Sequence, residues 1–184
     1  MALVTELDTP AVTIRLDVVE RNLRRVHEHL ARHGIANRPH VKTHKIPALG
    51  RMQMAAGAVG ITCQKLGEVE VFADAGVADD VLLAFNLIGR AKIERLLSLS
   101  RRLRRLAVVF DNEVVARGLS EGAHSAGATI PFLVECDTGL GRNGGARRTC
   151  IHRESAHDTG CDIGETDTHE IAIDRNGVLS LRRY

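Results

Sequence analysis

The sequence has few aromatic residues, little net charge and no long hydrophobic run. Aromatic side chains make up 3% of its 184 residues, tryptophan is absent, and the formal net charge is +2. We expect no nucleic-acid partner, because such a partner calls for basic patches and aromatic stacking platforms. No window reaches the roughly 18 apolar residues of a membrane span, and residues 1–8 lack a basic, apolar leader. We therefore expect a cytoplasmic protein with no membrane partner.

Cysteine is also scarce. Cys63, Cys136, Cys150 and Cys161 are too few for the disulfide framework of a secreted protein of this size. Cys63 and Cys136 lie inside apolar runs, so we predict that both are buried thiols.

What the sequence does contain is a repeating pattern with enough hydrophobic residues, 44%, for one sizeable core. Up to residue 137, short β-rich runs alternate with stretches of helical period, which favours βα units and a mainly parallel sheet. We predict strands over residues 11–16, 39–42, 59–63, 80–85, 106–110 and 130–137. The first helix follows an N-cap at Asp17, and the later helices are predicted over residues 47–56, 67–75, 91–100 and 112–126.

The strand starts are about 20 to 28 residues apart, which suits either a doubly wound sheet or a (β/α)8 barrel. A complete barrel takes about 250 residues, and here the pattern stops at the sixth strand. Residues 146–184 contain 13 hydrophobic residues of 39, against 68 of 145 before them. We therefore divide the chain into an α/β portion, 1–145, and an atypical polar tail, 146–184. That tail is expected to be disordered or to form one weak hairpin around Asn176-Gly177.

Lys42 lies where a predicted parallel strand ends, and such strand ends face the functional mouth of a barrel. By alternation, His40 and Lys42 share one side of that strand. A lysine that points into a barrel is costly unless it is paired or used chemically, for example as the nucleophile toward a carbonyl cofactor. From spacing alone, a solvent-exposed lysine is the simpler interpretation.

Three segments in order carry a more specific signal: residues 38–45 (RPHVKTHK), 58–68 (AVGITCQKLGE) and 134–144 (VECDTGLGRNG). With the opening DTPA at 8–11, they make the chain resemble the D-threonine aldolase and D-serine dehydratase family, which is related to the alanine racemase N-terminal domain. The resemblance covers residues 8–145, about the first half of a family member.

The resemblance implies a fold-type III pyridoxal 5'-phosphate (PLP) enzyme, with the cofactor at the mouth of a (β/α)8 barrel that a C-terminal β-domain completes. This chain would supply only about five or six βα units. Lys42 would hold PLP as a Schiff base, and Arg142 matches the arginine that approaches the phenolic oxygen of the cofactor. His40, His44 and Gln64 are candidates for the pocket lining, although each is more often a structural polar group.

The implied substrate is a small D-amino acid. A β-hydroxy D-amino acid would be cleaved to glycine and an aldehyde, or dehydrated to a keto acid and ammonia; a racemase-type activity is a further option. The divalent metal expected for the family would be bound by residues beyond this chain, and a homodimer is expected if the barrel is complete.

Other interpretations stay open. Residues 139–144 match the dinucleotide fingerprint G-x-G-x-x-G, but no apolar helix follows them. Cys150, His152, His157 and Cys161 offer potential zinc ligands at an uncommon spacing. The chain could also be a truncated or frame-disrupted, non-catalytic PLP-binding product, for which we expect an open parallel sheet edge.

Overall fold

The computed structural model describes residues 4–137, 139–146, 169–173 and 179–183. Its helices are α1 (Leu16–Arg32), α2 (Pro47–Ala55), α3 (Leu66–Asp74), α4 (Arg90–Ser100) and α5 (Glu113–Ser125), with 3-10 turns η1 (Val4–Glu6) and η2 (Val41–Thr43). Its strands are β1 (Ile61–Cys63), β2 (Asp80–Leu83), β3 (Arg105–Phe110), β4 (Pro131–Val134), β5 (Cys136–Asp137), β6 (Gly145–Ala146), β7 (His169–Ile173) and β8 (Leu179–Arg183).

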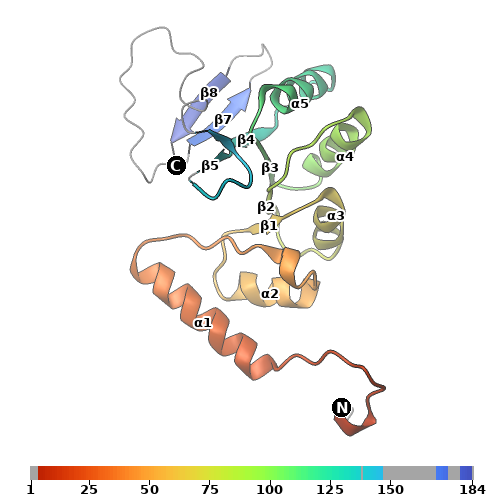
Figure 1. The fold of residues 1–184 in the computed structure, drawn as a ribbon, viewed down its shortest axis with the longest axis vertical. Helices are drawn as coiled ribbons and strands as arrows, with labels where there is room; N and C mark the ends of the chain where they lie inside the picture. Colours follow the sequence, from red (N-terminus) through yellow and green to blue (C-terminus); the bar gives the residue numbers. More distant parts are fainter. Residues whose placement is uncertain (1–3, 138, 147–168, 174–178, 184) are drawn as a thin grey trace.

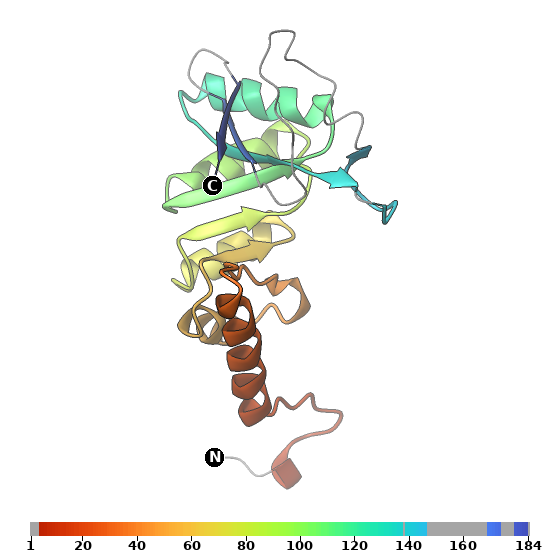
Figure 2. The same cartoon turned by 90° about the vertical axis from the view of Figure 1, so that its left-hand side faces the viewer.

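The main sheet has the order β1-β2-β3-β4-β7-β8. Its first four strands are parallel neighbours, with Ile61 opposite Val81, and Val108 opposite Phe132. Helices α3, α4 and α5 connect them and lie along one side of the sheet (Figures 1 and 2). This arrangement confirms the α/β class and a partial, unclosed barrel of βα units.

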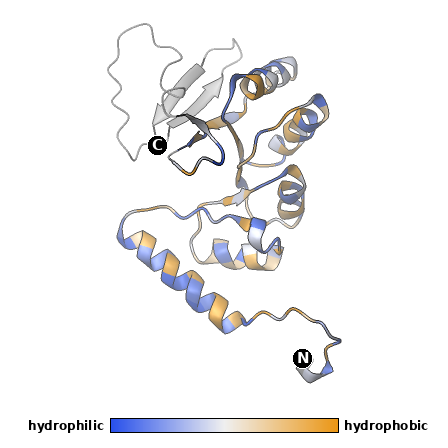
Figure 3. Ribbon diagram, in the orientation of Figure 1, coloured by the Kyte–Doolittle hydropathy of each residue, from blue (hydrophilic) through white to orange (hydrophobic). Residues whose placement is uncertain are grey.

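The core lies between these helices and the sheet. The strands contribute fully buried side chains such as Ile61 and Phe132, and the helices contribute Phe72, Leu96 and Leu119. Because each parallel strand is covered by a crossover helix, its apolar run is removed from water on that face. By contrast, α1 has no buried residue and is largely hydrophilic along its length (Figure 3).

The strand predicted over residues 11–16 is absent. Residues 11–15 have no regular secondary structure, α1 begins at Leu16, and the side chain of Val12 is 97% exposed. A strand forms by pairing, and no neighbouring strand within the described residues lies beside this segment. Asp17 is also not the N-cap: that position is Arg15, which forms an ion pair with Asp17 in the first turn.

The strand predicted over residues 39–42 is reduced to one parallel bridge between His40 and Thr62. Thr62 N donates to Pro39 O at 2.8 Å, and the chain then enters η2. Pro39 itself has no N–H to donate. The segment therefore runs beside β1 only briefly before it turns, and Lys42 projects from a 3-10 turn.

After β4, the parallel order ends. Strand β7 pairs antiparallel with β4, and β8 pairs antiparallel with β7, with Ile171 opposite Leu181. These strands coincide with the hairpin predicted from alternation, whereas its turn at residues 176–177 lies outside the described residues. Strand β7 thus covers the edge of β4, with Phe132 opposite Ile171. The sheet stays unclosed, and the parallel strand β1 remains at its other edge.

The two described cysteines differ. Cys63 in β1 is fully buried, and this burial raises the pKa of its thiol to about 12. Cys136 in β5 is exposed, so its predicted burial is wrong, because β5 leaves the main sheet and pairs with the short strand β6. Within the described residues, no helix has the length and hydrophobicity needed to cross a membrane.

Candidate functional site

A pocket of about 290 Å³ opens at the carboxyl ends of the parallel strands. Its lining comes from η2, from the residues after β1 and β2, and from the β5 region, and comprises His40, Lys42, Gln64, Ala84, Glu135, Cys136, Asp137, Leu140, Arg142 and Asn143. All four residues predicted for the site (Lys42, His40, Gln64, Arg142) therefore face one space, although they lie up to 102 positions apart in the sequence.

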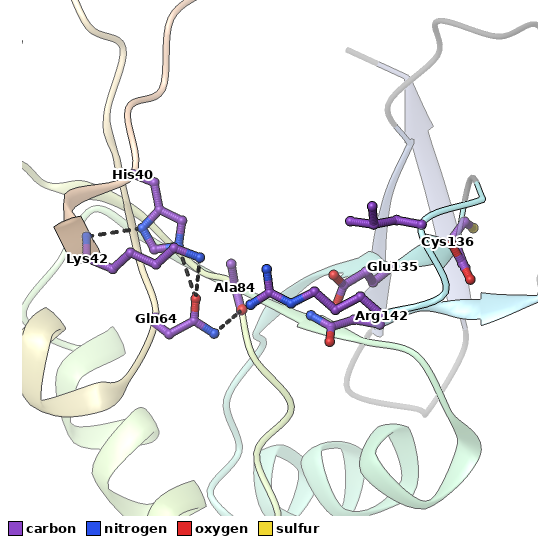
Figure 4. A pocket seen from close by; sticks show the side chains of 10 residues that line it. His40, Lys42, Gln64, Ala84, Glu135, Cys136 and Arg142 are labelled. Atoms are coloured by element: carbon purple, nitrogen blue, oxygen red, sulfur yellow. Dashed lines mark hydrogen bonds between the residues drawn. The ribbon is translucent and has the colours of Figure 1, made fainter.

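Lys42 is placed by its own turn. The side chain of His40 caps η2, accepting at Nδ1 from the backbone N of Lys42 at 3.3 Å. Val41 between them is fully buried and anchors the turn in the core. The Nζ of Lys42 donates to Gln64 Oε1 at 3.3 Å, so the amine points into the pocket (Figure 4).

His40 is held as a neutral ring. Its Nε2 lies 3.2 Å from Gln64 Oε1, an acceptor, while its Nδ1 accepts from the backbone, and both contacts are satisfied by the Nε2–H tautomer. Burial lowers the pKa of His40, and the charge of Lys42 lowers it further. His40 can therefore line the pocket without adding a second charge beside Lys42.

Gln64 is held through three atoms: its side-chain oxygen, which accepts from Lys42, its side-chain nitrogen and its backbone nitrogen. Its Nε2 donates to Ala84 O at 3.3 Å, and its backbone N donates to Glu68 Oε2 at 2.7 Å. Glu68 is 5% exposed and also pairs with Lys45 at 2.9 Å. Burial raises the pKa of Glu68, but the Gln64 N–H and Lys45 outweigh it and hold that pKa below its usual value. An ionised Glu68 thus links Lys45, three residues after Lys42, to Gln64, whose side chain accepts from the Lys42 amine.

Arg142 enters the pocket from the opposite side. It lies in the loop between β5 and β6, and its side chain extends toward Ala84 and Gln64 (Figure 4). Two cationic groups, Lys42 and Arg142, therefore face one open space from separate walls. Such an arrangement suits an anionic ligand that carries a carbonyl group.

His44 does not reach this pocket. Its Nε2 lies 3.3 Å from Gln53 Oε1, its Nδ1 accepts from Ile46 N at 3.0 Å, and its ring makes an edge contact with Phe72. The suggestion that His44 lines the pocket is therefore wrong. Lys42 and His44 are two positions apart, but η2 turns between them and directs their side chains to different surroundings.

Two supporting carboxylates were not identified from the sequence. Glu68 fixes Gln64, and Asp137 accepts backbone N–H groups from the loop that carries Arg142. The available signal for Asp137 was its place just before the glycines at 139 and 141, since an aspartate there can cap a tight turn. Glu68 had no comparable local signal, because it acts across the β1–α3 connection.

The dinucleotide interpretation of residues 139–144 is wrong. These residues form the loop between β5 and β6, and no helix begins at the loop. A pyrophosphate site of this kind needs a helix N-terminus directly after the glycines. The suggested zinc ligands, Cys150, His152, His157 and Cys161, lie outside the described residues.

The pocket fits PLP on its side-chain chemistry. It offers the Lys42 amine, the Arg142 guanidinium and the neutral polar side chains of His40, Gln64 and Asn143, beside the carboxylates of Glu135 and Asp137. Its volume of about 290 Å³ lies just below the range of about 300 to 1,000 Å³ for small-molecule sites. Within the described part of the chain, no group of three or more His, Cys, Asp or Glu side chains could hold a metal ion.

Known proteins are similar to this chain in sequence and in fold. The family described as "Alanine racemase, N-terminal domain" matches residues 14–155. D-threonine aldolase from an Arthrobacter species is 39% identical over 138 residues, which cover 75% of this chain and 36% of that enzyme. D-threo-3-hydroxyaspartate dehydratase from a Delftia species (strain HT23) is 36% identical over 168 residues, covering 89% of this chain and 43% of the relative.

Among solved structures, D-threonine aldolase from Filomicrobium marinum superposes with a TM-score of 0.73 at 44% identity, over 77% of this chain and 38% of that one. The chain thus spans well under half the length of these relatives. All the residues that line the pocket fall within the range that the family matches.

Proposed function

Since the chain belongs to the alanine racemase N-terminal domain family, we propose that it forms the PLP-binding part of a lyase that acts on β-hydroxy D-amino acids. The observation that carries this proposal is the convergence of Lys42 Nζ and Arg142 on one pocket at the strand ends. The similarity to the D-threonine aldolases from Arthrobacter and Filomicrobium marinum favours an aldolase of the D-threonine type, which releases glycine and an aldehyde.

In this proposal Lys42 binds the cofactor through its amine, and Gln64 holds that amine by its 3.3 Å hydrogen bond. His40 stays neutral and holds the backbone of Lys42 through its Nδ1 and the Gln64 side chain through its Nε2. Arg142 supplies a fixed positive charge to an oxygen of the cofactor. When bound, PLP accepts the electron pair left by a breaking bond at the substrate Cα, and the protein orients that bond.

The first test is cofactor binding by this chain. PLP is expected to produce a visible absorbance band and, after borohydride reduction, a stable adduct on the peptide that contains Lys42. The matched control is Lys45→Ala, because Lys45 is three residues away but pairs with Glu68. The band should survive Lys45→Ala and be lost in Lys42→Ala. Folded wild-type protein that shows no band and no adduct with PLP would refute the proposal.

The second candidate is a dehydratase, which the similarity to D-threo-3-hydroxyaspartate dehydratase supports. Both reactions can be followed with D-threonine in the presence of a divalent metal ion. Aldehyde and glycine as products identify the aldolase, whereas a keto acid and ammonia identify the dehydratase. Cofactor binding without either product would support a third assignment, a chain that binds PLP and does not complete the reaction.

A further inference from the structure

The loop that carries Arg142 is held at its start by one carboxylate. Asp137, the last residue of β5, accepts from Gly139 N at 2.9 Å and from Gly141 N at 3.1 and 3.0 Å. Gly141 directly precedes Arg142, so the carboxylate fixes the backbone just before the arginine. These backbone hydrogen bonds lower the pKa of Asp137, so it remains ionised and accepting at neutral pH.

A second carboxylate holds the far end of the same loop. Asp111, which follows β3, accepts from Gly144 N at 3.3 Å and from Asn86 Nδ2 at 2.8 Å. Gly144 packs so closely on β5 that a Cβ there would lie 2.5 Å from Asp137 N. The backbone of the loop is therefore held at both ends, by Asp137 at its start and by Asp111 at its end.

The side chain of Arg142 depends on this backbone for its position. Across the described residues, no hydrogen bond or ion pair holds its guanidinium, although that group extends into the pocket. An arginine side chain has several rotatable bonds, so a shifted backbone would move its charge away from a ligand.

Building on the proposed function, we propose that Asp137 and Asp111 are positioning residues that hold the Arg142 loop in place for cofactor binding. Asp137 has the larger effect because it makes the shorter contacts and sits nearest to Arg142. Neither carboxylate needs to touch PLP. Their contribution passes through Arg142 and disappears when the guanidinium is removed.

This dependence can be measured with a double-mutant cycle on PLP affinity. The dissociation constant is determined by absorbance titration for wild type, Asp137→Ala, Arg142→Met and the combined variant. Loss of one charge-assisted contact is expected to raise the dissociation constant about tenfold in each single variant. The combined variant should then bind no more weakly than Arg142→Met alone.

Conservative and remote variants complete the design. Asp137→Asn keeps an oxygen that accepts from the loop, so its affinity should stay within about threefold of wild type. Asp111→Ala should weaken binding less than Asp137→Ala. Asp79→Ala, an exposed residue before the amino end of β2, is the matched control and should leave affinity unchanged. Circular dichroism and urea midpoints identify any variant that fails to fold. If Asp137→Ala does not fold, the cycle is run with Asp111→Ala instead, and its loss of affinity should likewise disappear in the Arg142→Met background.

The outcomes separate the two proposals. If wild type binds PLP and Arg142→Met weakens binding while Asp137→Ala does not, the positioning role is overturned and the proposed function stands. Additive losses in the combined variant also overturn it, because Asp137 would then act independently of Arg142. If wild type does not bind PLP at all, the proposed function itself fails, and the positioning role fails with it.

Discussion

Two glycines in α5 provide a sharp test of how the helices pack around the partial barrel. Gly118 and Gly122 lie one turn apart on the same helix, and both face Ile93 of α4. A Cβ at position 118 would meet Ile93 Cδ1 at 3.7 Å, an ordinary contact, whereas a Cβ at position 122 would overlap Ile93 Cγ2. The same change to alanine is therefore expected to have opposite effects at the two positions.

The magnitudes follow from helix propensity and packing. Alanine favours a helix interior over glycine by about 1 kcal/mol, so Gly118→Ala should raise the free energy of unfolding by about 0.5 to 1 kcal/mol. Gly122→Ala gains the same helix propensity, but its new methyl group overlaps the β-branched side chain of Ile93, which costs about 1 to 3 kcal/mol of stability. Its net effect should be a loss of about 1 kcal/mol.

The assay is urea unfolding followed by circular dichroism, with Ile93→Ala and Ile93→Ala/Gly122→Ala added to complete a cycle. Ile93 is 8% exposed, so Ile93→Ala alone should cost about 2 to 5 kcal/mol. In the combined variant the overlap is absent, and the coupling energy should favour the pair by at least about 1 kcal/mol. Equal stabilisation by Gly118→Ala and Gly122→Ala would show that α4 and α5 do not pack as described.

Three further results are expected. Burial raises the pKa of Asp80, but the hydrogen bond and charge of Arg38 outweigh it and hold that pKa below its usual value. The stability that ionised Asp80 contributes is present above about pH 5 and is lost as the pH falls through the lowered pKa of its carboxyl group. Asp80→Asn has no such group to protonate, so between about pH 6 and pH 3 its free energy of unfolding in urea should fall less than that of wild type. Iodoacetamide at about pH 8 should modify the exposed Cys136 and spare the buried Cys63, which peptide mass spectrometry can measure. Because Cys136 lines the pocket, bound PLP should slow its reaction. Equal labelling of the two cysteines would contradict the described burial. Asn112 caps α5, so Asn112→Ala should lower the free energy of unfolding by about 1 kcal/mol, and an unchanged urea midpoint would argue against the cap.

The helices could be predicted closely because their signals are local. The predicted helix over residues 91–100 is α4 at Arg90–Ser100, and the one over 112–126 is α5 at Glu113–Ser125. Apolar period, capping residues and glycine stops all act within a few positions of each other. The strands over 80–85 and 106–110 were found for a similar reason, since each is a short apolar run between two such helices.

The predicted strands at residues 11–16 and 39–42 failed because strand formation depends on a partner elsewhere in the chain. Val12 and Ile14 alternate as a strand would, yet both side chains are exposed and their segment is unpaired within the described residues. The segment with Lys42 has a partner in β1 for only one bridge before η2 begins. β-propensity alone could not reveal either outcome.

For the site, the sequence by itself determined which residues to consider. Lys42, His40, Gln64 and Arg142 were identified from three motifs in order, and their chemical roles remain predictions. Only the tertiary structure decided that these four share a pocket and that His44 faces Phe72 instead. A motif specifies residue types along the chain, whereas a site requires side chains from several strand ends to converge, and that convergence is set by sheet register and loop path.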